Sequence, residues 1–267
     1  MEATISFREV RLGFGEGDVL EELSFQVFPR ETLVLLGETG SGKTLSLKMA
    51  AGLLRPLAGE VSVLGRRVSG MKEKDLLDFR REIGFVFQEG ALFDSMSVEE
   101  NVAYRLREEM VPEEEIGPRV REALRFVELE HAIEQMPSEL SGGMRRRVSI
   151  ARALITKPPI VLYDSPTAGL DPVTSQTIIA LILRLRDTYG VTALLATHRL
   201  QDGFALANFY FDPASNRVLS NREKAGRPQE SESNTRFAVL RDGRVFFEGS
   251  PEELAVVKDP YLKRFLV

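Results

Sequence analysis

The segment GETGSGKT, residues 37–44, combines glycines with a lysine and a threonine in a spacing that can hold a polyphosphate. Gly37, Gly42, Lys43 and Thr44 fit the pattern G-x-x-x-x-G-K-[ST], between the apolar run TLVLLG and the helix-forming stretch LSLKMAAGLL. Glycines allow successive N–H groups to face the phosphates, and a helix N-terminus adds a positive dipole end. We therefore expect Lys43 to reach the β- and γ-phosphates and the Thr44 hydroxyl to ligate magnesium.

An aspartate that could complete this site ends the apolar run IVLYD at residues 160–164. A carboxylate at the end of a buried strand can meet magnesium opposite Thr44, so Asp164 is the second expected metal ligand. Together, the loop and Asp164 predict a nucleoside triphosphate site. The expected nucleotide ligands from this part of the chain are Gly37, Glu38, Thr39, Gly40, Ser41, Gly42, Lys43, Thr44 and Leu45.

Alternating strands and helices must position these residues. The apolar run at 32–37 is typical of a strand buried on both faces. The apolar runs at 160–164 and 192–197 also predict strands, and helix-forming sequence lies between the three. This alternation predicts a mostly parallel sheet with crossover connections. Shorter strand patterns at 5–7 and 23–27 predict further strands in the N-terminal part of the chain.

Between about residues 96 and 137 the sequence becomes charged and helix-forming, and Pro112, Pro118 and Pro137 mark expected helix breaks. We interpret residues 90–156, approximately, as a helical subdomain inserted into the α/β core.

The later part of the chain contains an expected insertion at about residues 212–236. FYFDPASNRVLS resembles a short hairpin, and NREKAGRPQESESNT has almost no apolar residues to offset the entropy of ordering it. We predict that this second piece is flexible, as a surface insertion without chemistry. Beyond it, FAVLRDGRVFFEG predicts two strands joined by an Asp-Gly turn, and SPEE at 250–253 predicts a capped helix.

Composition limits the function classes. The 267 residues are 43% hydrophobic and 28% charged, which is typical of a soluble globular protein of one large or two small domains. The net charge of −5 argues against nucleic acid as a partner, and the lack of cysteine excludes thiolate metal clusters and cysteine nucleophiles. We find no secretory signal, and no window approaches the about 18 apolar residues of a membrane span. Any membrane-spanning component is therefore expected to be another chain.

The segment LSGGM at residues 140–144, followed by RRRVSIARAL, lies between the loop and the strand-end aspartate. Here the sequence resembles the ATP-binding subunits of ABC transporters, whose signature is usually LSGGQ, and the resemblance covers nearly the whole chain. Ser141 can cap a helix whose free N–H groups offer a second anion-binding surface. The resemblance implies a head-to-tail dimer in which Ser141, Gly142, Gly143 and Met144 close on the ATP of another subunit.

The same resemblance implies roles for four further positions. Phe14 is similar to the aromatic that stacks on adenine, although an ordinary core or surface phenylalanine is the alternative. Gln88, after IGFVF, is similar to the glutamine that touches magnesium and the attacking water. Asp171 in SPTAGLDP corresponds to the loop that crosses the dimer, and His198 after TALLAT to the switch histidine that holds the γ-phosphate.

Two details resemble the ATPases of Mla/MCE-type systems, which move phospholipids or other hydrophobic molecules across the bacterial envelope. One is Met144 at the end of the signature, and the other is GALFDSMSV at 90–98, where the ATPase would meet its permease. The apolar cluster Ala91, Leu92, Phe93 and Met96 is equally consistent with core packing.

The sequence departs from the family at Ser165, where these ATPases carry a glutamate that polarises the hydrolytic water. A serine hydroxyl can orient water but is a poor proton acceptor. Three interpretations follow: a slow ATPase in which Gln88 and His198 position the water, a regulatory subunit that binds ATP, or a subunit that pairs with a different ATPase carrying the glutamate. We favour the first, because phosphoryl transfer depends mainly on positioning and charge stabilisation.

The sequence thus predicts an α/β fold: a P-loop NTPase core of the ABC type, with a mostly parallel sheet, an N-terminal antiparallel β subdomain and an inserted helical subdomain, over a single domain 1–267. The expected cofactors are ATP and Mg²⁺. The catalytic residues implied by the resemblance are Lys43, Gln88, Asp164, Ser165 and His198, with Thr44, Gln88 and Asp164 as magnesium ligands.

The partners implied by the resemblance are a multi-span permease, a second ATP-binding subunit that would be an identical copy, and an MCE-type lipid-binding subunit. These partners would place the chain at the cytoplasmic face of the bacterial inner membrane, as a peripheral protein. An amino-acid or metabolite importer is the alternative system. ABC proteins of translation or DNA repair fit less well, because this length cannot contain two ATP domains and long coiled coils are absent from the sequence.

Overall fold

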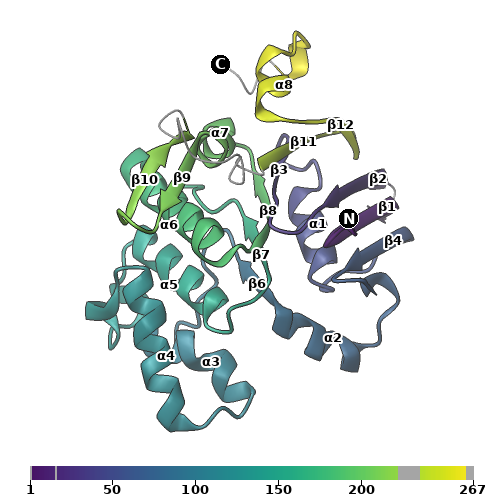
Figure 1. Ribbon diagram of the computed structural model, residues 1–267. Coiled ribbons are helices and arrows are strands. Elements are labelled where there is room, and N and C mark those ends of the chain that lie inside the picture. Colours follow the sequence, from purple (N-terminus) through teal and green to yellow (C-terminus); the bar gives the residue numbers. More distant parts are fainter. Residues whose placement is uncertain (1, 16, 222–234, 263–267) are drawn as a thin grey trace.

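The computed structural model describes residues 2–15, 17–221 and 235–262. Figure 1 shows a central sheet, a second sheet from the N-terminal part of the chain beside it, and a group of helices on the other side. This arrangement is the α/β fold with a mostly parallel sheet that the sequence predicts.

The N-terminal sheet is antiparallel, with strand order β2-β1-β4-β5. Phe7 and Phe25 are register partners, and their stacked ring centroids lie 4.4 Å apart. The strands extend well beyond the predicted pieces 5–7 and 23–27, because polar residues alternate with apolar ones on the exposed face. The bounds are β1 Ile5–Phe14, β2 Gly17–Val27, β4 Ala58–Val63 and β5 Arg66–Arg67.

The central sheet has the order β12-β11-β3-β8-β7-β6, and only the edge strand β12 is antiparallel to its neighbour among these described strands. The apolar runs are continuous because each face of the sheet covers a different core. Val34 and Leu36 pack toward the helices, whereas Leu33 and Leu35 pack toward the N-terminal sheet. The bounds are β3 Thr32–Leu36, β6 Ile83–Val86, β7 Ile160–Asp164, β8 Thr192–Thr197, β11 Thr235–Arg241 and β12 Arg244–Gly249.

Helices cover both faces of the central sheet. The helices that follow β6 and precede β7 along the chain form a separate group. The helices are α1 Lys43–Ala50, α2 Glu73–Phe79, α3 Val98–Glu108, α4 Glu113–Phe126, α5 Gly142–Leu154, α6 Pro172–Tyr189, α7 Leu200–Asn208 and α8 Pro251–Val256. Short 3-10 turns occupy Val68–Gly70, Arg80–Glu82, Glu130–Ala132 and Pro137–Glu139. In Figure 1, α3 and α4 lie at the lower left, away from the N-terminal sheet at the right. No helix in the described ranges is long and apolar enough to cross a membrane.

One expected helix break was wrong. Pro112 precedes α4 and Pro137 begins a 3-10 turn, but Pro118 lies inside α4. A proline there removes the hydrogen bond to the carbonyl of Glu114. Because Glu114 and Pro118 are both exposed, water can satisfy that carbonyl, and burial of Ile116, Val120 and Leu124 on the opposite face holds the helix together.

The predicted hairpin of the insertion is present as β9 Phe209–Asp212 and β10 Arg217–Ser220, which pair antiparallel. The predicted flexible piece, residues 222–234, lies outside the described residues. The Asp-Gly turn between β11 and β12 and the capping box of Ser250 and Glu253 on α8 are both confirmed.

We expect Pro118→Ala to raise the free energy of unfolding by about 1 to 3 kcal/mol, because alanine restores the missing backbone hydrogen bond and has a better helix propensity. Denaturant titration would measure the change. As the control, Arg119→Ala breaks only an exposed ion pair with Glu115 and should cost about 0.5 kcal/mol or less. A Pro118→Ala protein no more stable than the wild type would contradict this account of α4.

Candidate nucleotide site

The glycine loop connects the carboxyl end of β3 to the first residue of α1. Gly40 and Gly42 have φ values of 84° and 95°, a backbone region that glycine enters without strain. A Cβ on Gly42 would also lie 2.3 Å from the Leu20 side chain, so the loop is packed against β2. These constraints explain the glycines at positions 40 and 42 and give a loop whose backbone curls around the start of the helix.

The Lys43 side chain lies inside this loop. Its Nζ donates to the carbonyl oxygens of Gly37 and Glu38, at 2.8 Å each, and lies 3.4 Å from the Ser41 hydroxyl oxygen. Burial lowers the pKa of the Lys43 amine, while the nearby Asp164 acts in the opposite direction. The loop therefore holds a poorly solvated cation, which is suited to bind an oxyanion.

Thr44 and Asp164 meet as the sequence predicts. The Thr44 hydroxyl donates to Oδ1 of Asp164 at 3.0 Å, and the Ser165 hydroxyl donates to the same oxygen at 3.5 Å. Asp164 is 5% exposed, and its burial raises the pKa of the carboxyl, against the hydrogen bonds from Thr44 and Ser165. A hydroxyl and a carboxylate side by side form the oxygen donor set that Mg²⁺ prefers when phosphates complete its coordination.

Ser165 occupies a strained position at the end of β7. Its φ is +46°, and its backbone N–H donates to the carbonyl of Ala196 in β8 at 2.8 Å. A non-glycine residue in this region costs free energy and persists where the surroundings fix it, often at functional sites. The hydrogen bond to β8 is one such constraint, so the pairing with the sheet fixes the backbone of Ser165 and thereby the direction of its side chain.

The remaining expected catalytic residues follow neighbouring strands. β3, β8, β7 and β6 run parallel, so the loop, His198, Ser165 and Gln88 all leave the same edge of the sheet. Gln88 and His198 are exposed there. Phe14 ends β1 in the other sheet and is 59% exposed, which excludes the alternative of a core phenylalanine.

The signature residues begin α5. Ser141 is its N-cap, with its hydroxyl oxygen accepting the N–H of Met144 at 3.2 Å. Gly143 packs against α6, since a Cβ there would lie 2.4 Å from Cγ2 of Thr174, whereas a Cβ on Gly142 would make only an ordinary contact. Asp171 is the N-cap of α6, and its carboxylate accepts from the N–H groups of Val173 and Thr174. The starts of α5 and α6 are therefore packed side by side.

A buried network behind His198 was not predicted. Asp202, in α7, accepts hydrogen bonds from Thr167 and Thr197, and burial raises the pKa of its carboxyl. Arg199 donates to the carbonyl of Thr167 and to the hydroxyl of Ser175. This network ties the loop after Ser165 to the loop that carries His198. Neither Asp202 nor Arg199 belongs to a sequence motif. The only sequence signal is that Asp202 is an aspartate on the buried face of an amphipathic helix.

Two further side chains hold the GALFDSMSV stretch. Arg152 donates to the carbonyls of Gly90 and Ala91, and the buried Asn101 bonds the backbone N–H and carbonyl of Phe93. The stretch is only partly core: Leu92 packs against the core, whereas Phe93 is 40% exposed and its ring lies 4.8 Å from that of Tyr104. The apolar cluster therefore reaches the surface.

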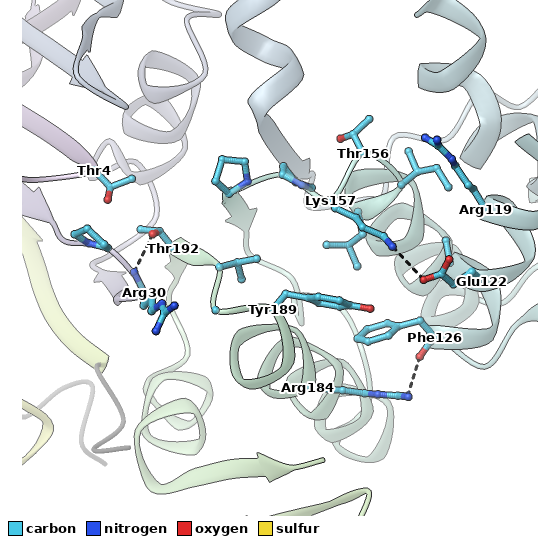
Figure 2. A pocket seen from close by; sticks show the side chains of 18 of the residues that line it. Thr4, Arg30, Arg119, Glu122, Phe126, Thr156, Lys157, Arg184, Tyr189 and Thr192 are labelled. Carbon is cyan, nitrogen blue, oxygen red and sulfur yellow. Dashed lines mark hydrogen bonds and ion pairs between the residues drawn. The ribbon is translucent and has the colours of Figure 1, made fainter. Parts of the chain in front are cut away.

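The described residues also line a cavity of about 1020 Å³ at the opposite, amino-terminal edge of the strands. Figure 2 shows some of its charged side chains engaged: Lys157 pairs with Glu122 at 3.2 Å, and Arg184 donates to the carbonyl of Phe126 at 3.2 Å. Helices α4, α5 and α6 end beside it, and cations near helix C-termini are favourable. These charges have a structural explanation, and none of the predicted site residues line this cavity.

The fold and the carboxyl-edge site define a nucleotide-binding protein of the P-loop class. A family model described as ABC transporter matches residues 20–168. The methionine import ATP-binding protein MetN 2 of Bacillus cereus is 38% identical over 73% of this chain and 59% of its own length. The intermembrane phospholipid transport system ATP-binding protein MlaF of Haemophilus influenzae is 34% identical over 78% of this chain and 80% of its own length.

A plant relative and two solved structures are also similar to this chain. TRIGALACTOSYLDIACYLGLYCEROL 3, a chloroplastic protein of Arabidopsis thaliana, is 41% identical over 98% of this chain and 72% of its length. A dimeric, post-hydrolysis structure of the ATP-binding cassette MJ0796 with ADP and Pi has a TM-score of 0.75 at 29% identity, covering 92% of this chain and 98% of its own. The cbiO1 protein of Clostridium perfringens has a TM-score of 0.77 at 26% identity, covering 95% and 91%.

The chain belongs to the ABC transporter family, as an ATP-binding subunit. It spans about three-fifths of the length of MetN 2 and most of the length of MlaF.

We expect Asp164→Asn to raise the melting temperature at neutral pH while abolishing ATP hydrolysis. Because burial raises the pKa of Asp164 in the folded state, the ionised carboxylate opposes folding above the unfolded-state pKa of about 3.9. Asparagine keeps an acceptor for Thr44 without the charge. The stability gain should therefore grow as the pH rises from about 4 toward 7 and vanish in acid.

Asp171→Asn provides the control with the opposite sign. Hydrogen bonds from Thr174 hold the pKa of the Asp171 carboxyl below its usual range, so its charge stabilises the fold above the unfolded pKa, and that gain is lost in acid. Thermal melts of both variants from pH 4 to 7 measure the two trends. An Asp164→Asn protein less stable than the wild type at pH 7 would contradict the assigned burial penalty.

Proposed function

We propose that this chain drives a membrane transporter by binding ATP with Mg²⁺ and hydrolysing it slowly between two copies of itself. The observation that carries this proposal is the meeting of the Lys43 amine, the Thr44 hydroxyl and the Asp164 carboxylate at one glycine loop. In this account residues 1–267 act as one ABC-type domain, with residues 90–156 as its helical subdomain.

ATP contacts divide between the two sheets. Phe14 offers an exposed ring to adenine, and the backbone N–H groups of residues 37–45, with Lys43, hold the phosphates. Thr44, Asp164 and Gln88 would hold Mg²⁺, which would neutralise phosphate charge. The fit rests on the 3.0 Å approach of Thr44 Oγ1 to Asp164 Oδ1, since both atoms can face one cation.

Ser165 orients the hydrolytic water. Its hydroxyl donates to Asp164, which leaves its lone pairs to accept a hydrogen from water. It does not remove a proton, so the γ-phosphate takes the proton, while Gln88 and His198 position the water and the phosphate. Loss of a general base typically costs a factor of about 10² to 10⁴ in rate, which is why we propose slow turnover.

A second copy completes each site. The N-terminus of α5 presents Ser141 and Gly142 at the surface with Met144 partly buried behind them, and its free N–H groups suit a γ-phosphate. Asp171 orders the neighbouring start of α6 through its cap. Closure transmits force to the permease only if ATP binds the closed state better than the open one.

For the cargo we propose lipids, in an Mla/MCE-type system with a multi-span permease and an MCE-type lipid-binding subunit, at the cytoplasmic face of the bacterial inner membrane. The support is that the match covers more of the length of the lipid-transport relative and of the relative named after a lipid than of the importer relatives. MlaF and the Arabidopsis protein, which carries the name of a glycerolipid, are matched over 80% and 72% of their lengths. MetN 2 and PotA, a spermidine/putrescine import ATP-binding protein of Lawsonia intracellularis, are matched over 59%.

The second candidate is an importer of an amino acid or another metabolite, favoured by the 38% identity to MetN 2. A regulatory subunit that binds ATP without useful hydrolysis is the third, and the observation that favours it is serine at position 165.

Turnover of four proteins tests the hydrolytic mechanism: wild type, Lys43→Ala, Ser165→Ala and Ser165→Glu. We expect Lys43→Ala to be inactive and Ser165→Ala to be slower than the wild type. Ser165→Glu should be faster by about 10²-fold, because it supplies the missing base. Phosphate release at saturating ATP and Mg²⁺ measures each rate. A wild type no faster than Lys43→Ala would exclude hydrolysis, and a Ser165→Ala protein as fast as the wild type would exclude water orientation by Ser165.

Capture of the tagged chain from its native membrane tests the cargo. We expect a multi-span permease and an MCE-type lipid-binding subunit to co-purify, and phospholipid to accompany them. Recovery of a permease with an amino-acid or polyamine binding protein would instead support the importer, and ribosomes would overturn both.

A further inference from the structure

Arg146 is a buried cation that lies between two loops of the reaction site. It stands in the second turn of α5 and is 5% exposed. Its Nη1 donates to the carbonyl of Phe87 at 2.6 Å, and its Nη2 donates to the carbonyl of Ala168 at 3.4 Å. One planar guanidinium therefore contacts both the residue before Gln88 and the loop that follows Ser165.

Both carbonyls belong to tight turns that carry catalytic positions. The N–H of Ala168 donates to the carbonyl of Ser165 at 3.0 Å, so fixing Ala168 also restricts Ser165. The N–H of Gly90 donates to the carbonyl of Phe87 at 2.9 Å, which encloses Gln88 in a turn of the same kind. Arg146 thus bonds the first residue of one turn and the last residue of the other.

The neighbouring arginines do not bridge these loops. Arg145 donates to the carbonyl of Leu140 in its own segment, and Arg147 donates to the carbonyl of Val127 in the helical group, both at 3.1 Å. Of the three consecutive arginines, Arg146 is the one that α5 turns toward the site.

The position is costly for the fold. Burial lowers the pKa of the Arg146 guanidinium, while Asp164 and Glu89 act in the opposite direction. Its Nε is buried without a hydrogen-bond partner among the described residues. Buried cations that meet carbonyls and not a close carboxylate gain little stability from their charge. Geometry at the site explains the residue better than stability does.

We propose that Arg146 is a positioning residue for ATP hydrolysis, which holds the Gln88 turn and the Ser165 turn at a fixed separation. This inference rests on the roles proposed for Gln88 and Ser165. Since Ser165 supplies no base, the rate depends on how well water is placed between these turns, and a misplacement of about 1 Å can cost about 10² in rate. Arg146 acts through backbone carbonyls and does not touch the nucleotide.

The test compares Arg146→Gln, Arg146→Lys and the matched control Arg147→Gln in the full chain, by kcat, KM for ATP and melting temperature. We expect Arg146→Gln to lower kcat by about tenfold to a hundredfold with little change in KM. Arg146→Lys should recover part of the loss, because an ammonium can bond one carbonyl well but lacks the planar fork. Arg147→Gln, which loses one carbonyl bond away from the site, should keep kcat near the wild-type value.

A double variant separates a positioning role from a merely structural one. The readout is the factor by which Arg146→Gln lowers kcat with and without the Ser165 hydroxyl. In a Ser165→Ala background, Arg146→Gln should lower kcat by a smaller factor than in the wild type, because part of its effect passes through Ser165. Equal factors in both backgrounds, an unchanged kcat in Arg146→Gln, or equal losses in Arg147→Gln would overturn the proposal. If Arg146→Gln does not fold, a wild-type kcat in Arg146→Lys would overturn it.

These outcomes are distinct from failure of the proposed function. A wild type no faster than Lys43→Ala would remove hydrolysis and this inference together. If the wild type hydrolyses ATP and Arg146→Gln has the same kcat, only the inference about Arg146 fails.

Discussion

The hydrogen bond from Thr44 to Asp164 joins the start of α1 to a strand 120 residues further along the chain. It forms because β3 and β7 flank β8 in parallel, so that their carboxyl ends reach one edge of the sheet. The alternate packing of β3, with Leu33 and Leu35 on one core and Val34 and Leu36 on the other, fixes that register. A slip by one residue would exchange the two faces and move the loop away from the carboxylate.

Around this bond the molecule buries charge at the expense of stability. Four charged side chains are buried here: Lys43, Asp164, Arg146 and Asp202. Burial lowers the pKa of the two cations and raises the pKa of the two carboxyls, so that in each case it favours the neutral form. Ser165 adds backbone strain at the same edge. Such costs are expected where a site must be organised before its ligand arrives, because fixed dipoles and charges then need little rearrangement during the reaction. The arginines that meet carbonyls and the aspartate that meets hydroxyls hold the loops in place.

Much of this could be predicted from the sequence, and the exceptions have physical reasons. The loop motif, the strand ending in Asp164 and the cap at Ser141 are local patterns, and the structure has the predicted elements there. The sequence could not show which of Arg145, Arg146 and Arg147 faces inward, because that depends on how α5 packs. Helix propensity alone predicts a break at Pro118, whereas burial of the opposite face of α4 outweighs that propensity. The contacts of Asp202 depend on tertiary neighbours that no motif marks.

In the proposed mechanism, ATP closes two copies of this chain, and slow hydrolysis with Ser165 lets the closed state last. Light scattering during size-exclusion chromatography, with ATP and Mg²⁺ in the buffer, tests this most directly. The account predicts a wild-type dimer that outlasts the injection and returns to monomer as ADP forms, while Lys43→Ala stays monomeric. A wild-type chain that keeps the same mass with and without ATP would contradict it.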